Sequence, residues 1–129
     1  MVRHTVPSRR RDAGDILTSA NLSARNLLRI GVVVLALGTA IIHLYLGSLG
    51  FPLFLLNGLG YLALVAALYL PIPQLARYRD AVRWAFIGYA ALTIVLWILV
   101  GARTPIGYAD KLIEIALITL LLIEGRRTR

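Results

Sequence analysis

The sequence predicts an all-α fold, a four-helix transmembrane bundle with both termini on the cytoplasmic side. Three observations lead to this prediction. Hydrophobic residues make up 59% of the 129-residue chain, well above the roughly 45–50% that is usual in soluble proteins. They fall into four long apolar runs that turn-forming residues separate. The basic residues gather between alternate runs, as in membrane proteins that keep positive loops in the cytoplasm.

Each apolar run approaches the length of about 20 helical residues that crosses a hydrocarbon core of roughly 30 Å. Pro52 suits the first turn of the second helix, and Pro71 and Pro73 end it because proline cannot continue a helix. The fourth run is the weakest, because charged residues interrupt its beginning. The expected spans are 27–46, 51–70, 82–100 and 106–123, within a transmembrane domain of residues 25–125.

Basic tails flank this domain at residues 1–24 and 126–129. The first tail contains a Ser-Arg-Arg sequence that is similar to the start of a twin-arginine export signal. Asp12 follows where that signal requires hydrophobic residues, so we expect the tail to be retained. A short amphipathic helix over residues 16–28 can lie at the membrane surface, and a disordered tail is the other interpretation.

The basic residues predict the orientation of the spans. Twelve of the fourteen Arg and Lys residues lie within residues 1–29, 71–83 or 126–129, and the turn at 47–50 holds none. Because positive residues stay on the cytoplasmic side, we expect both termini there, in the inner (cell) membrane of a prokaryote.

The same residues suit contacts with anionic lipid headgroups or with other integral membrane subunits. We do not expect nucleic-acid binding, because aromatic residues do not alternate with the basic cluster of the first tail. The predicted headgroup or partner contacts are Arg9, Arg10, Arg11, Arg77, Arg79, Arg83, Arg126 and Arg127.

Polar residues from three apolar runs are expected to converge in the outer half of the membrane. At 1.5 Å per helical residue, His43, Asn57 and Glu114 lie about 5, 9 and 12 Å from the outer ends of their spans, and Asp110 lies nearer the surface. Ionisable residues inside a membrane are costly and are therefore candidates for function. One interpretation is a polar clamp between helices. The other is a pocket that exchanges protons or contacts a ligand from outside.

Asp110 and Glu114 lie four residues apart, so they share one helix face. Two carboxylates this close repel each other, so either one stays protonated or a nearby base neutralises the pair. The candidate bases are His43, Arg103 and Lys111.

His43 is also the one residue to consider as a ligand for a pigment. A haem held by two histidines is not expected, because the other histidine, His4, lies in the tail. One histidine is enough to bind a chlorin pigment, but no other feature of the sequence favours a pigment site. We expect no metal site and no cofactor apart from lipid, and pigment or quinone contact has no supporting motif.

The stretch FLLNGLGYLALVAALYLP, with IIHLYLG upstream, resembles small four-span membrane proteins of prokaryotes whose activity is uncharacterised. His43, Asn57, Gly58, Gly60 and Tyr61 carry the resemblance, which covers roughly the first hairpin. It implies a four-span fold and no activity.

Two functions are compatible with these features. The sequence has no cysteine, and we find no phosphate-binding loop, no nucleophile with its base and no metal-ligand spacing, so we do not expect an enzyme. The favoured function is a non-catalytic accessory subunit of a larger membrane complex, of the respiratory or photosynthetic type. The alternative is a small homo-oligomeric transporter or proton-handling protein that uses the outer-half polar residues.

Overall fold

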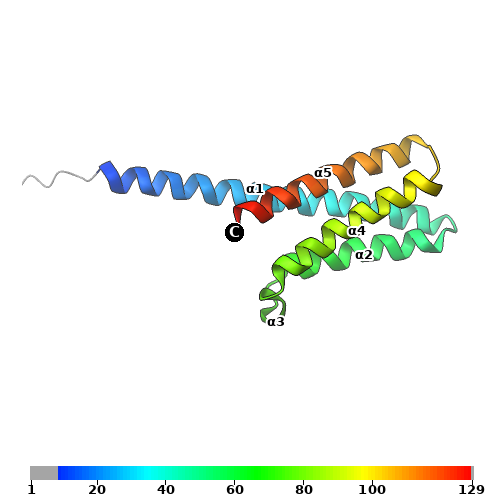
Figure 1. Ribbon diagram of the computed structural model, residues 1–129, viewed down its shortest axis with the longest axis horizontal. Coiled ribbons are helices and arrows are strands. Elements are labelled where there is room, and N and C mark those ends of the chain that lie inside the picture. Colours follow the sequence, from blue (N-terminus) through cyan, green and yellow to red (C-terminus); the bar gives the residue numbers. More distant parts are fainter. Residues whose placement is uncertain (1–8, 129) are drawn as a thin grey trace, which may run out of the picture.

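The computed structural model describes residues 9–128, and all regular secondary structure in that range is helical, which confirms the all-α part of the prediction (Figure 1). Residues 1–8 of the first predicted tail and residue 129 of the second lie outside the described residues. The helices of the described part are α1 (Arg9–Ser48), α2 (Pro52–Tyr69), α3 (Pro73–Ala76), α4 (Arg79–Val100) and α5 (Pro105–Arg127).

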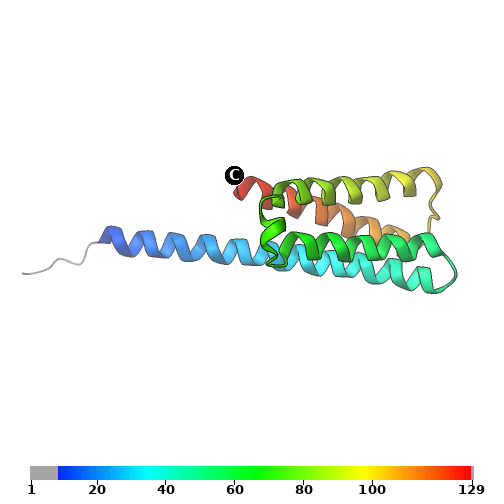
Figure 2. The ribbon, with the colours of Figure 1, turned by 90° about the horizontal axis from the view of Figure 1, so that it is seen from below.

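The four long helices form a ring in which each packs against two neighbours. α1 contacts α2 and α5, and α4 contacts the same two helices. α2 and α5 therefore lie on one diagonal of the bundle, and α1 and α4 lie on the other. The short helix α3 joins α2 to α4 at the end of the bundle where the C-terminus also lies (Figure 2).

Three of the helices, α1, α2 and α4, are long and apolar enough to cross a membrane. α5 has 23 residues and matches α4 in length, but it carries more charge. Its first half contains Asp110, Lys111 and Glu114, and all three are buried in the bundle. The outer surface of α5 is apolar, with Leu112 68% and Ile115 51% exposed.

α1 differs from the expected first span, because it begins at Arg9 and continues for 40 residues. At 1.5 Å per residue this helix is about 60 Å long, and its N-terminal part extends beyond the bundle (Figures 1 and 2). The amphipathic segment predicted at residues 16–28 is part of α1, with Ile16 69% and Leu17 65% exposed. No proline interrupts this segment, so the helix continues into the first span.

α1 and α2 approach each other closely through small residues. A Cβ atom at Gly58 would lie 2.8 Å from Leu44 Cγ and 3.0 Å from the Ala40 carbonyl oxygen. Gly50, in the turn between the helices, has a φ of +106°, a conformation that glycine adopts without the steric cost of a side chain.

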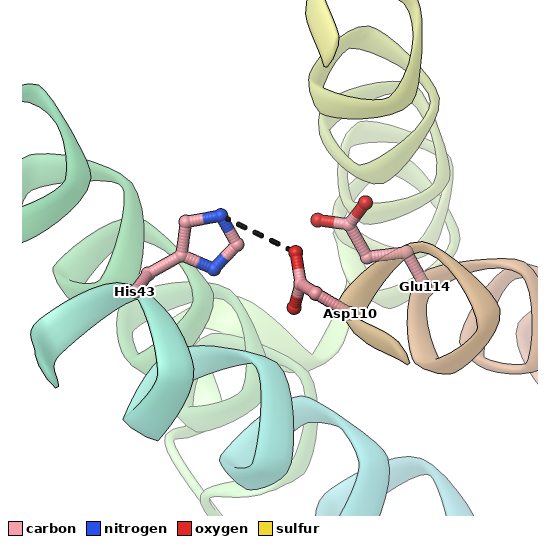
Figure 3. Close-up of side chains that lie close together, drawn as sticks. All are labelled: His43, Asp110 and Glu114. Carbon is pink, nitrogen blue, oxygen red and sulfur yellow. Dashed lines mark ion pairs between the residues drawn. The ribbon is translucent and has the colours of Figure 1, made fainter. Parts of the chain in front are cut away.

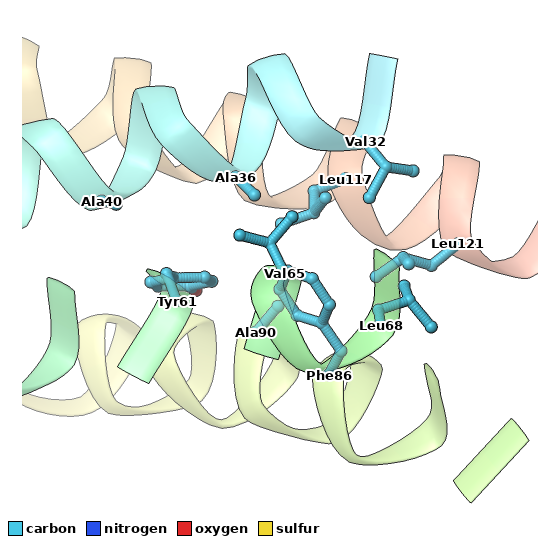
Figure 4. Packing of buried hydrophobic residues seen from close by; sticks show 10 residues of the cluster. All are labelled: Val32, Ala36, Ala40, Tyr61, Val65, Leu68, Phe86, Ala90, Leu117 and Leu121. Carbon is cyan, nitrogen blue, oxygen red and sulfur yellow. The ribbon is translucent and has the colours of Figure 1, made fainter. Parts of the chain in front are cut away.

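An apolar layer of buried residues fills the middle of the bundle (Figure 4). All four long helices contribute to it, which ties the two helical hairpins together. The members are Val32, Ala36, Ala40, Tyr61, Val65, Leu68, Phe86, Ala90, Leu117 and Leu121.

Candidate functional site

A cluster of buried polar residues lies between the apolar layer and the end of the bundle that carries the α1–α2 and α4–α5 turns. We call it the ionic cluster, and all four long helices contribute to it. His43, Asp110, Lys111 and Glu114 are each 7% exposed or less. The members are Thr39 and His43 on α1, the hydroxyl of Tyr61 on α2, whose ring belongs to the apolar layer, Thr93 on α4, and Asp110, Lys111 and Glu114 on α5.

Glu114 lies at the centre of the ionic cluster and is fully buried. Its Oε1 accepts hydrogen bonds from the Tyr61 hydroxyl at 2.6 Å and from Thr93 Oγ1 at 2.8 Å. Its Oε2 accepts one from Lys111 Nζ at 2.6 Å. A single carboxylate thus connects α2, α4 and α5.

Asp110 connects α5 to α1 (Figure 3). Thr39 Oγ1 donates a 2.7 Å hydrogen bond to its Oδ1. Its Oδ2 lies 3.1 Å from Lys111 Nζ and 3.6 Å from His43 Nε2. The Lys111 ammonium group therefore lies between the two carboxylates and reduces their mutual repulsion.

Arg103, another candidate for neutralising these carboxylates, lies at the end of α4. Its guanidinium group donates hydrogen bonds to the carbonyl oxygens of Trp97 and Ile98, at 3.2 and 2.7 Å. It also lies 4.2 Å from the centroid of the Trp97 ring, a cation–π contact. Arg103 therefore caps the last turn of α4, where the helix dipole favours a cation.

The hydrogen bonds of His43 define the orientation of its ring. Nδ1 lies 2.8 Å from the Thr39 carbonyl oxygen, which can only accept, so Nδ1 carries a hydrogen. Nε2 faces Asp110 Oδ2 at 3.6 Å. Apart from this imidazole, the charged groups of the ionic cluster are two carboxylates and one ammonium group.

Three residues of the cluster also offer ligand atoms of a metal site. One atom each of His43, Asp110 and Glu114 lies within 4.8 Å of the others. Imidazole and carboxylate groups are a donor set that zinc uses. However, Lys111 Nζ already contacts both carboxylates, and a metal ion would have to displace it. An ion-pair network in which lysine is the cation accounts for this geometry.

The structure brings His43, Asp110 and Glu114 together, whereas Asn57 contacts Tyr89 through its backbone. The Asn57 carbonyl oxygen accepts a 2.9 Å hydrogen bond from the Tyr89 hydroxyl. The imidazole ring of His43 packs near two aromatic rings. Its centroid lies 5.8 Å from that of Phe54 and 5.7 Å from that of Tyr61.

Sequence reasoning missed the roles of three hydroxyl groups. Thr39 precedes His43 by one helical turn, and Tyr61 follows Asn57 by one turn, so helical spacing offered a signal for both. Thr93 is the one hydroxyl residue in the apolar stretch 90–100, which is a weaker signal.

A second polar group lies on the other side of the apolar layer, at the end that contains α3. Arg83 donates hydrogen bonds to Asp80 at 2.6 Å and to Glu124 at 3.2 Å, and the Tyr69 hydroxyl donates to Glu124. Arg83 was predicted as a headgroup contact, yet it is only 3% exposed. The other predicted contacts whose exposure the structure describes are exposed: Arg10, Arg11, Arg77, Arg79, Arg126 and Arg127.

Comparison of the chain with protein-family models, with curated proteins and with solved structures found no match. No family is therefore assigned to the chain. The structure shows a small all-helical protein with three helices that are long and apolar enough to cross a membrane.

Proposed function

We propose that all four long helices cross a prokaryotic cell membrane, with both termini in the cytoplasm. The length of α5 and its packing against α1 and α4 support a fourth span. The charges in the first half of α5 face the bundle, where they pair, and apolar residues face outward, as lipid requires. Arg77, Arg79, Arg126 and Arg127 then lie on the cytoplasmic side.

Within that membrane the protein acts as a non-catalytic subunit of a larger assembly. The observation that carries this proposal is the layered core. The carboxylates of the ionic cluster pair with Lys111, and at the other end of the bundle Glu124 pairs with Arg83. Buried residues of the apolar layer lie between these two sets of ion pairs. Such a core holds four helices in a fixed arrangement and offers no polar route through the bundle.

The outer surface supports the same role. Large apolar side chains are exposed on every long helix, including Leu53 at 79%, Leu99 at 71% and Leu112 at 68%. These surfaces can pack against lipid or against the helices of other subunits. The projecting part of α1 gives an additional surface outside the bundle for a partner (Figure 1).

Extraction from native membranes tests this proposal. Membranes are solubilised in a mild detergent, and the extract is separated under native conditions and analysed by mass spectrometry and absorption spectroscopy. Migration of the chain with a large complex supports the subunit role, and the spectrum shows whether pigment or haem accompanies that complex. Migration of the chain alone or as a small homo-oligomer contradicts it.

One observation favours a proton-handling protein as the second candidate. His43 Nε2 faces Asp110 at 3.6 Å, and one additional proton balances the charge of the ionic cluster. Because the apolar layer blocks a route through one bundle, proton transfer across the membrane requires several copies of the chain. Liposomes that contain the purified protein should then dissipate a pH gradient, and H43Q should remove that activity while R103Q retains it. Equal rates for the liposomes with and without protein exclude this candidate.

A further inference from the structure

A cavity of about 260 Å³ lies where α1 leaves the bundle, between α1 and the ends of α2, α4 and α5. It is on the opposite side of the apolar layer from the ionic cluster. Five arginines and one carboxylate line it: Arg25, Arg29, Arg79, Arg83, Arg127 and Glu124.

The positive charge of this lining is largely unbalanced within the chain. Glu124 is engaged by Arg83 and by the Tyr69 hydroxyl, and Asp80 also pairs with Arg83. In the part of the chain that the structure describes, no carboxylate forms an ion pair with Arg25, Arg79 or Arg127. Five arginines therefore line one cavity that contains a single carboxylate, which Arg83 already engages.

Arg83, which lines the cavity, also carries an unsatisfied hydrogen-bond donor. Its Nε is the one buried side-chain nitrogen or oxygen of the described residues that has no hydrogen-bond partner. Burial of a charged group with an unsatisfied donor is costly. A negative charge in the cavity beside Arg83 reduces that cost.

The rest of the lining combines three leucines with the polar side chains of Asn26, Tyr69 and Thr128. Leu22 and Leu28 of α1 and Leu68 of α2 contribute to the same cavity, and Leu22 is 53% exposed. A free inorganic anion gains nothing from these side chains. A phospholipid places a phosphate beside the first carbons of its glycerol and acyl chains, and so matches both kinds of surface.

We propose that this cavity binds the phosphate of an anionic phospholipid from the cytoplasmic leaflet. Guanidinium groups recognise phosphate oxygens through paired hydrogen bonds, and basic residues near the membrane attract anionic lipid. The site requires that the helices cross the membrane, but it does not depend on whether the protein is a subunit or handles protons.

Native mass spectrometry of the full chain in a non-ionic detergent tests the site with phosphatidylglycerol, phosphatidylcholine and inorganic phosphate as probes. We expect one tightly held phosphatidylglycerol and weaker retention of phosphatidylcholine. The triple variant R25Q/R79Q/R127Q should bind phosphatidylglycerol about a hundredfold more weakly, because each basic residue near an anionic surface contributes roughly fivefold.

The matched control is R11Q/R77Q/R126Q, which removes the same charge from exposed positions outside the cavity and should retain the lipid. L22E keeps every arginine, places a carboxylate in the cavity wall and should also weaken binding. Equal loss in the control and the triple variant would show unspecific attraction and overturn the proposal. Equal stabilisation by inorganic phosphate and by phosphatidylglycerol would overturn the lipid assignment. Neither result bears on the subunit role, which the native separation tests.

Discussion

The Tyr61 hydroxyl donates a 2.6 Å hydrogen bond to Glu114 across the diagonal of the bundle. α2 and α5, which carry these residues, are not neighbours in the ring of helices. The bond therefore constrains the distance between opposite helices directly. Contacts between neighbouring helices constrain that distance only indirectly.

Y61F removes this diagonal bond and should lower the free energy of unfolding by about 1.5–3 kcal/mol, the usual range for a hydrogen bond to a charged group. Thermal unfolding in detergent, followed by circular dichroism, measures the effect. Tyr45 is 57% exposed, so Y45F is the matched control and should leave the midpoint unchanged. Equal midpoints for Y61F and the unmodified protein would refute the diagonal role.

E114Q should be the most destabilising conservative change in the chain. Glu114 accepts three hydrogen bonds while fully buried, and removing one partner of a buried ion pair costs about 3–5 kcal/mol. We expect a lower unfolding midpoint and reduced abundance in membranes. Normal abundance together with loss of a transport activity would instead support the proton-handling candidate.

The combined variant K111M/E114Q should be less harmful than the sum of its two single changes. Lys111 and Glu114 lie 2.6 Å apart. K111M alone leaves the carboxylates of both Asp110 and Glu114 without the ammonium group, whereas the double change leaves only Asp110 in that state. A double-mutant cycle on unfolding midpoints measures the coupling, which for contacting residues is about 0.5–3 kcal/mol. Simple additivity would argue against a direct ion pair.

G58A should weaken the contact between α1 and α2. Its new Cβ would lie 2.8 Å from Leu44 Cγ and 3.0 Å from the Ala40 carbonyl oxygen, so the helices must separate. Overpacking of this kind typically costs about 1–3 kcal/mol. At Gly88 nothing lies within 4 Å of the added Cβ, so G88A should be neutral or stabilising. The same thermal assay compares the two variants.

Single cysteines test the four-span topology, because the sequence has no cysteine of its own. We expect S48C and A102C to react with an impermeant maleimide added outside intact cells, and Q74C and T128C to react only after lysis. All four positions are exposed in the structure. Reaction of T128C from outside would show that α5 does not cross the membrane.

The sequence predicted the four long helices and their turns, because the lengths of the apolar runs and the positions of the prolines define long helices almost by themselves. α2 differs from the prediction by one residue at each end. The beginning of α1 was not predicted, since an amphipathic segment that meets an apolar span without a proline can continue as one helix or separate from it. The local pattern does not distinguish these outcomes.

The candidate site was accessible to sequence reasoning in part. Depth along each span brought His43, Asp110 and Glu114 to the same half of the predicted spans, and the structure places them together. Depth gives no rotation about the helix axis, however, so it could not show that Tyr89 bonds to the Asn57 backbone while Tyr61 reaches Glu114. The arginine cavity depends on the path of α1 beyond the bundle, which no local pattern defines.

The apolar layer has a consequence for how the protein responds to change. Glu114 and Glu124 lie ten residues apart on α5, about 15 Å along the helix, with Leu117 and Leu121 buried between them. Groups separated by more than about 7–10 Å without shared partners contribute additively to stability. We therefore expect substitutions at Glu114 and at Glu124 to change the free energy of unfolding additively, so that either end of the bundle can be redesigned without a compensating change in the other.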